Sequence, residues 1–179
     1  MTVVRRRSMR RAKKRNQTCK KSKTNIQHHH MLLRMETTKY PKKEEKVFVE
    51  NLLRRIIIDL DMNIIGKPHL HYLETPIENK GFTGVASIQT SHVSFHFWDE
   101  PAKDWLQNKE SKSLLQFDLY TCGNLTRPHI QKLIKALSIY DPTHIDIDLM
   151  NRKHKLKMDG HYHWDNRTNM TFGRWLETI

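Results

Sequence analysis

Residues 89–100 carry the stretch QTSHVSFHFWDE, in which apolar and polar side chains alternate. The apolar face of an extended chain would hold Val93, Phe95 and Phe97. The opposite face would hold side chains that exchange protons or form hydrogen bonds: His92, Ser94, His96 and Trp98. An alternation of period two is typical of a half-buried β-strand. The stretch therefore predicts a strand with one face on a core and one face available for chemistry.

A second stretch, LQFDLYTCG at residues 115–123, has the same design. Phe117 and Leu119 fall on one face, and Asp118, Tyr120 and Cys122 fall on the other. If the two strands are neighbours, His96 and Cys122 both lie on the face away from the core. We therefore expect these two side chains to reach one pocket.

The remaining apolar patterns predict two helices and four further strands. Residues 43–60 and 126–137 carry apolar side chains at helical spacing, and Thr126 and Pro128 suit the start of the second helix. Alternating or short apolar runs predict strands at residues 30–36, 69–73, 83–89 and 143–150. The order β-α-β-β-β-β-α-β predicts an α+β two-layer sandwich, with an antiparallel sheet covered on one face by two helices.

Charge divides the chain into three parts. The net charge is +13, yet residues 1–35 hold 12 Lys/Arg and no acid, so the rest is nearly balanced. We expect a basic arm at 1–26 that is too polar to fold alone, a domain at 27–151, and an extension at 152–179. Aromatic side chains in the extension predict that it packs on the domain. The arm is either a solvated tail or a non-specific contact for RNA, DNA or another polyanion.

Several functional classes do not fit the sequence. There is no apolar run of 18 residues and no signal peptide pattern, so we expect a cytoplasmic protein without a membrane contact. Two cysteines, Cys19 and Cys122, are too few for a disulfide framework. The pairs His69/His71 and His161/His163 each share a strand face, but nothing in the sequence brings the pairs together, so we expect no metal site.

The two central stretches resemble the prokaryotic S-adenosylmethionine decarboxylase family. The likeness depends on Gly84, on Ser91 with His92, His96, Trp98 and Glu100, and on the run DLYTCG at 118–123. The predicted element order from His30 to Met150 also fits. Thr90 departs from the family, which normally has glutamate before the serine.

The resemblance implies a proenzyme that cleaves itself between Thr90 and Ser91 and converts Ser91 into a pyruvoyl group. This cofactor forms a Schiff base with the substrate amine and accepts electrons when carbon dioxide leaves. By the same resemblance His96 serves self-processing and Cys122 returns a proton. Thr83 and Glu100 match a family hydroxyl and carboxylate, and we assign both to the substrate-binding site.

The resemblance further implies a homodimer that decarboxylates S-adenosylmethionine for spermidine and other polyamine synthesis. Two alternatives remain open at this point. The same chemistry could act on another amino acid, such as arginine or ornithine. A non-catalytic homologue could instead contact nucleic acid through residues 1–26, with Thr90 marking the loss of cleavage.

Overall fold

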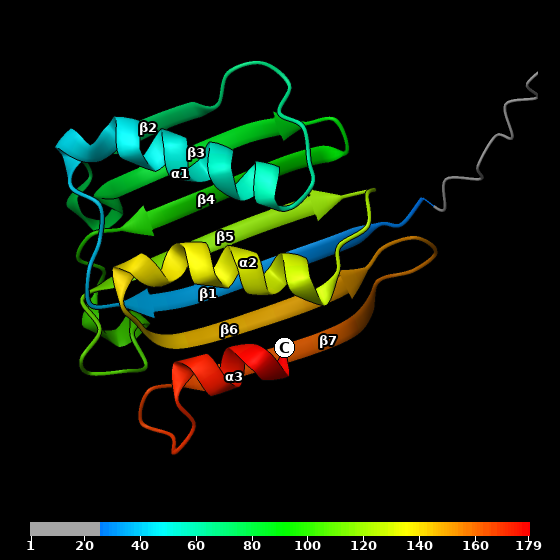
Figure 1. The fold of residues 1–179 in the computed structure, drawn as a ribbon. Helices are drawn as coiled ribbons and strands as arrows, with labels where there is room; N and C mark the ends of the chain where they lie inside the picture. Colours follow the sequence, from blue (N-terminus) through cyan, green and yellow to red (C-terminus); the bar gives the residue numbers. More distant parts are fainter. Residues whose placement is uncertain (1–25) are drawn as a thin grey trace, which may run out of the picture.

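The computed structural model describes residues 26–179, and its seven strands form one sheet in the order β2-β3-β4-β5-β1-β6-β7 (Figure 1). Every neighbouring pair is antiparallel. The strands are β1 (His29–Thr37), β2 (His69–Leu73), β3 (Gly81–Ile88), β4 (Ser91–Trp98), β5 (Ser113–Thr121), β6 (Pro142–Asn151) and β7 (Lys157–Asp165). The predicted strands are confirmed, and residues 91–98 of the alternating stretch form β4.

Three helices cover one face of this sheet (Figure 1). They are α1 (Lys46–Asp59), α2 (Arg127–Leu137) and α3 (Phe172–Thr178). The apolar stripes of α1 and α2 are buried against strand side chains such as Val93 and Ile147. Each buried Leu or Ile contributes about 1.5–3 kcal/mol before the entropy of ordering is subtracted. The predicted α+β two-layer sandwich is confirmed.

The C-terminal extension contains two elements that the sequence patterns did not predict. β7 pairs with β6 along the sheet edge, and α3 lies on the helical layer. Trp164, Trp175 and Ile179 are buried in the same core as the other helices and strands. The extension is therefore part of the packed body.

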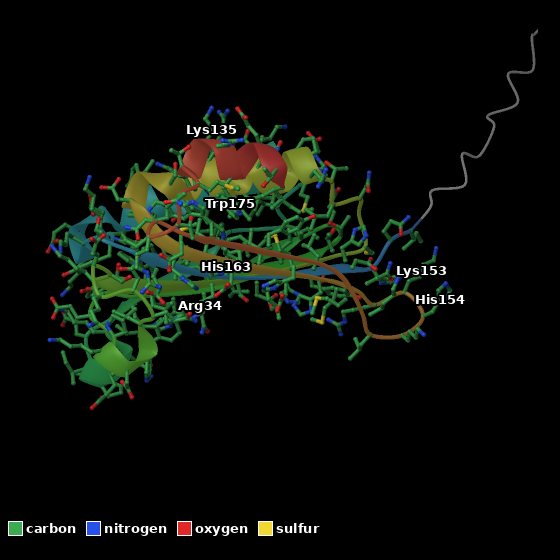
Figure 2. All side chains as sticks on the ribbon, turned by 90° about the horizontal axis from the view of Figure 1, so that it is seen from below. Arg34, Lys135, Lys153, His154, His163 and Trp175 are labelled. Atoms are coloured by element: carbon green, nitrogen blue, oxygen red, sulfur yellow. The ribbon has the colours of Figure 1, made fainter. Side chains whose placement is uncertain are left out.

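Within residues 26–179, no α-helix covers the opposite face of the sheet. In Figure 2 Trp175 lies on the helical side, whereas Arg34 and His163 lie on the other side of the sheet. This open face carries the polar side chains of the alternating strands.

One end of the open face is covered by residues 99–112, which hang below the sheet in Figure 2. The polar and charged sequence of residues 101–113 predicts a surface loop, but Asn108 is only 1% exposed. The N–H groups of Gln107 and Asn108 and the hydroxyl of Ser111 donate to the buried carboxylate of Glu36. Burial alone would raise the pKa of Glu36, but these hydrogen bonds and the one from Arg34 outweigh it and lower the pKa. The loop is therefore anchored to β1 by a buried charge.

Residues 1–25, which make up nearly all of the predicted basic arm, lie outside the described residues. Within residues 26–179, none of the helices has the length and apolar character needed to cross a membrane.

Candidate active site

Ser91 begins β4 directly after the two-residue turn that connects it to β3. Its backbone φ is +147°, a value that residues with a side chain rarely adopt. Such a conformation costs on the order of 1–3 kcal/mol and persists only where the surroundings impose it. Here the turn is held on both sides, because Gln89 donates to the carbonyl of Asn63 at 2.9 Å and Cys122 donates to that of Thr90 at 3.0 Å. The backbone at Ser91 is therefore strained.

The carbonyl oxygen of Thr90 accepts two hydrogen bonds from one residue. The backbone N–H of Cys122 donates at 3.0 Å and its thiol donates at 3.1 Å. The Thr90 side chain is fixed as well, since Thr121 Oγ1 donates to Thr90 Oγ1 at 2.9 Å. Two donors that converge on one carbonyl oxygen can stabilise negative charge that develops there.

A chain of polar side chains leads away from the Ser91 hydroxyl. Ser91 Oγ lies 3.1 Å from Nδ1 of His92, whose Nε2 lies 3.7 Å from Oδ1 of Asp118. The other carboxylate oxygen of Asp118 lies 2.7 Å from Nε2 of His30. The sequence patterns gave no role to His92 or Asp118. His92 could have been found because it follows Ser91 directly, but Asp118 is revealed only by the strand register, which pairs it with Ser94.

His96 lies near the other end of β4, opposite Thr83 on β3 and Gln116 on β5. Its ring centroid is 4.0 Å from that of Trp98, and its Nε2 is buried with no hydrogen-bond partner among residues 26–179. Burial lowers the pKa of His96, although a hydrogen bond with the backbone of Asn79 and the charge of Asp99 oppose the shift. A neutral imidazole with a free nitrogen is suited to accept a proton.

Two groups of predicted site residues therefore lie apart. Ser91 and His96 are five residue steps apart on an extended strand, which corresponds to roughly 16 Å. Cys122 lies still further from His96, because it is six residue steps along the chain from Gln116, which pairs with His96. The expectation that His96 and Cys122 reach one pocket is therefore wrong within a single chain, because alternation fixes the face of a strand and not the position along it.

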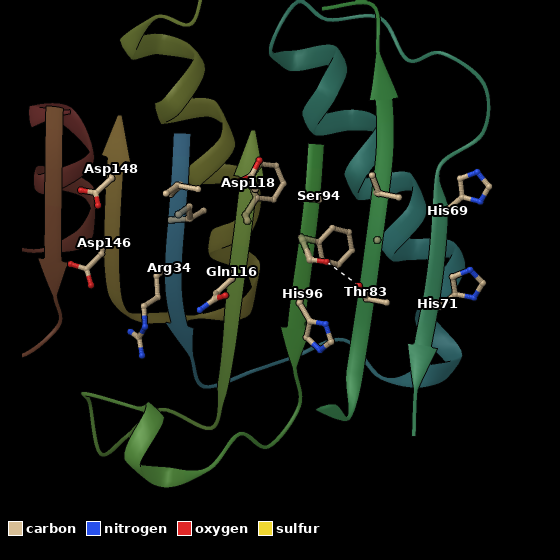
Figure 3. A pocket seen from close by; sticks show the side chains of 16 residues that line it. Arg34, His69, His71, Thr83, Ser94, His96, Gln116, Asp118, Asp146 and Asp148 are labelled. Carbon is tan, nitrogen blue, oxygen red and sulfur yellow. Dashed lines mark hydrogen bonds between the residues drawn. The ribbon is translucent and has the colours of Figure 1, made fainter. Parts of the chain in front are cut away.

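The remaining predicted residues lie at the His96 end. The Thr83 hydroxyl donates weakly to the carbonyl of Phe95 at 3.5 Å, which Figure 3 marks. Glu100 follows β4, is exposed, and accepts a hydrogen bond from Tyr40 at 3.1 Å.

The open face is hollowed into a groove of about 720 Å³ that extends from β2 to β6 (Figure 3). Thr83 and His96 line it, whereas Ser91 and Cys122 do not. Its other charged side chains are mainly acidic: Asp118, Asp146 and Asp148 beside Arg34. Gly84 belongs to its lining, and the bare Cα is required because a Cβ there would lie 2.6 Å from the Phe95 ring.

Residues 29–153 match the family model for S-adenosylmethionine decarboxylase. The chain belongs to this family. The matched range contains both ends of the site, from Thr83 to Cys122, and excludes β7 and α3.

One curated relative is a named proenzyme of this family. The S-adenosylmethionine decarboxylase proenzyme of Picrophilus torridus is 32% identical over 81 residues, or 44% of this chain and 52% of the relative. The chain thus spans about half the length of this relative.

Proposed function

We propose that the chain is a self-cleaving S-adenosylmethionine decarboxylase whose pyruvoyl group derives from Ser91. The observation that carries this function is the strained Ser91 backbone beside a Thr90 carbonyl held by two donors. Family membership supports the substrate class, and the word proenzyme in the name of the relative supports the processing step.

Cleavage begins at the Ser91 hydroxyl. Its oxygen attacks the carbonyl carbon of Thr90 while the proton passes to Nδ1 of His92, 3.1 Å away. Negative charge develops on the Thr90 oxygen, where the N–H and thiol of Cys122 stabilise it. The C–N bond then breaks, the amine takes a proton, and an ester joins Thr90 to the Ser91 side chain. Release of the strain at Ser91 favours this direction.

A second step separates the two fragments. A base removes the α-proton of Ser91, and the bond between its Cβ and the ester oxygen breaks. Thr90 leaves as a carboxylate, and water displaces ammonia from the remaining residue to leave a ketone. We assign the base role to His96, whose neutral, unpartnered Nε2 suits it.

Once formed, the pyruvoyl carbonyl supplies the electron sink that decarboxylation of an amino acid requires. The residues of this chain position and protonate the reactants. Cys122 lies at the cleavage point, and its thiol loses its hydrogen-bond acceptor when Thr90 leaves. The thiol is then free to deliver a proton to the carbon that has lost carbon dioxide.

The distance between the two ends of the site calls for a second subunit. We infer a homodimer in which two open faces pack around a two-fold axis that runs across the strands, because such an axis brings opposite ends of the same strands together. The partner's His96 and Thr83 would then face Ser91 and Cys122. Covering the open face would also enclose the groove and exclude water from it.

The acidic groove favours a cationic substrate. Asp118, Asp146 and Asp148 line it, and S-adenosylmethionine carries both a sulfonium and an ammonium charge. We place the product in spermidine and polyamine synthesis on the basis of the family. Arginine and ornithine are the amino acids to assay beside S-adenosylmethionine.

Intact mass spectrometry of the purified protein tests this function. The wild type should give fragments 1–90 and 91–179, the second with a blocked terminus, and should release carbon dioxide from S-adenosylmethionine. Ser91→Ala should remain one chain and be inactive. A wild-type protein that stays unbroken would contradict the assignment.

A further inference from the structure

Two histidines and an aspartate meet on the open face of β6 and β7, at the edge of the groove that Asp146 also lines. Nε2 of His144 lies 2.8 Å from Oδ2 of Asp146, and Nδ1 of His163 lies 2.7 Å from Oδ1 of Asp146. The three ligand atoms all lie within 4.8 Å of one another. Spacing within one strand shows only the pair His161/His163, whereas the β6–β7 register places His163 opposite Asp146.

The His144 ring is also held on the side away from Asp146. The residue is 1% exposed, and its Nδ1 lies 3.2 Å from Oδ2 of Asp165. Arg167 holds this carboxylate through its backbone N–H and its Nε, both at 2.8 Å from Oδ1. A carboxylate behind an imidazole is the usual support of a metal-binding histidine, because it fixes the ring and leaves the other nitrogen for the metal. Nε2 of His144 therefore points at Asp146 in the orientation that a ligand requires.

His144 lies between two carboxylates, with Asp165 beside its Nδ1 and Asp146 beside its Nε2. A divalent cation held between Nε2 and the Asp146 carboxylate would offset the negative charge of Asp146. His163 is exposed, so it can move by the few tenths of an ångström that metal–ligand bonds of about 2.0–2.1 Å demand.

We propose that His144, Asp146 and His163 form a binding site for a divalent transition-metal ion, with zinc as the best fit. Two imidazoles and a carboxylate suit zinc better than magnesium or calcium, which prefer oxygen ligands. Three protein ligands leave a fourth position for water. The site ties β7, which lies beyond the range matched by the family, to β6, which lies within it. The ion therefore stabilises the attachment of this additional strand.

Zinc titration of the full-length protein against a chromogenic chelator tests the site. The exposed His163 is the residue to change, because a variant of the buried His144 can fail to fold. Wild-type protein should bind one zinc ion more than His163→Ala, and zinc should raise the unfolding temperature of the wild type alone. Asp165→Asn, which keeps the side-chain shape, should weaken binding by roughly 10–100-fold.

His161→Ala is the matched control. His161 lies on the same strand and face and pairs with Asp148, outside the cluster, so its loss should leave zinc binding unchanged. His28, His29 and His30 can also attract zinc, and for that reason the readout is the difference between variants. Replacing zinc by cobalt should give a visible absorption band in wild type and His161→Ala, and none in His163→Ala. Equal zinc binding by wild type and His163→Ala, or equal weakening by His161→Ala, would overturn the site.

Discussion

The two ends of β4 differ in what they can do. At the Ser91 end the backbone is strained, and the Thr90 carbonyl is held by Cys122. At the other end His96 is shielded by Trp98, has a lowered pKa, and faces the groove with Thr83. In the proposed function, the Ser91 end breaks a bond and the His96 end takes a proton.

If Ser91 and His96 act on the same bond, as proposed, neither end of β4 holds all the groups that the reaction needs. A strand holds its residues at fixed intervals, so no side-chain rotation brings His96 to Ser91 across roughly 16 Å. The proposed mechanism therefore requires groups from two chains. The following experiments separate the contributions of the two ends.

Mixing two inactive variants should give the largest effect. Ser91→Ala lacks the nucleophile and His96→Ala lacks the base, so each alone should remain uncleaved. Co-expressed, they should form mixed dimers in which the His96→Ala chain is cleaved, with roughly a quarter of all sites restored. Denaturing gels of differently tagged chains measure this. The control replaces Ser91→Ala by the double variant, which should rescue nothing. A mixed dimer that purifies intact and uncleaved would refute the shared site.

Removing the thiol should have the next largest effect, at the Ser91 end. Cys122→Ala removes one of two donors to the Thr90 oxygen and should slow cleavage by roughly 100-fold. The backbone N–H remains, so cleavage should not stop. Cys122→Ser keeps a donor and should be slowed less. Disappearance of the full-length chain over time gives the rates. Equal rates for the two variants would mean that Sγ does not act on this oxygen.

The pH dependence of cleavage should report the His96 end. Burial lowers the pKa of His96 below its ordinary value of 6.5. The neutral imidazole is the active base, so cleavage should persist as the pH falls through 6.5 and be lost only as it falls through the lowered pKa. Trp98→Ala exposes the ring and should move this acid limb to higher pH. An acid limb at the same pH in both proteins would show that another group controls the step.

A small effect is expected at Glu100, beyond the His96 end. Its carboxylate is exposed, so loss of its charge in Glu100→Gln should raise KM for S-adenosylmethionine by about 5-fold or less. The value of kcat should not change. Tyr40→Phe removes the hydrogen bond to Glu100 but keeps the charge, and it should leave KM nearly unchanged. If both variants raise KM equally, the loop geometry and not the charge is responsible.

Local patterns predicted most of the fold. Alternation placed Val93 and Phe97 in the core, and helical spacing placed the stripe of α1 against the sheet. β7 was missed because its outward face is polar and charged, and its apolar positions include a glycine. α3 has only seven residues, too few for a helical period to stand out.

The candidate site was predicted residue by residue but not as an arrangement. Alternation correctly gave the open face to His96, yet strand register decides which residues are neighbours across the sheet. Strand register places Thr90 beside Cys122 and His163 beside Asp146, and neither contact can be predicted from the spacing of residues along the sequence. The covering of Glu36 by residues 107–111 is likewise a tertiary contact that no local pattern contains.

The strand order has a consequence for the molecule after scission. β1, β2 and β3 belong to the first fragment, and β4 to β7 belong to the second, yet β1 lies between β5 and β6. The two fragments are interleaved and share one hydrophobic core, so they cannot separate while the sheet persists. Recovery from full denaturation would then depend on protein concentration, because two separate polypeptides must meet before either can rebuild its part of the sheet.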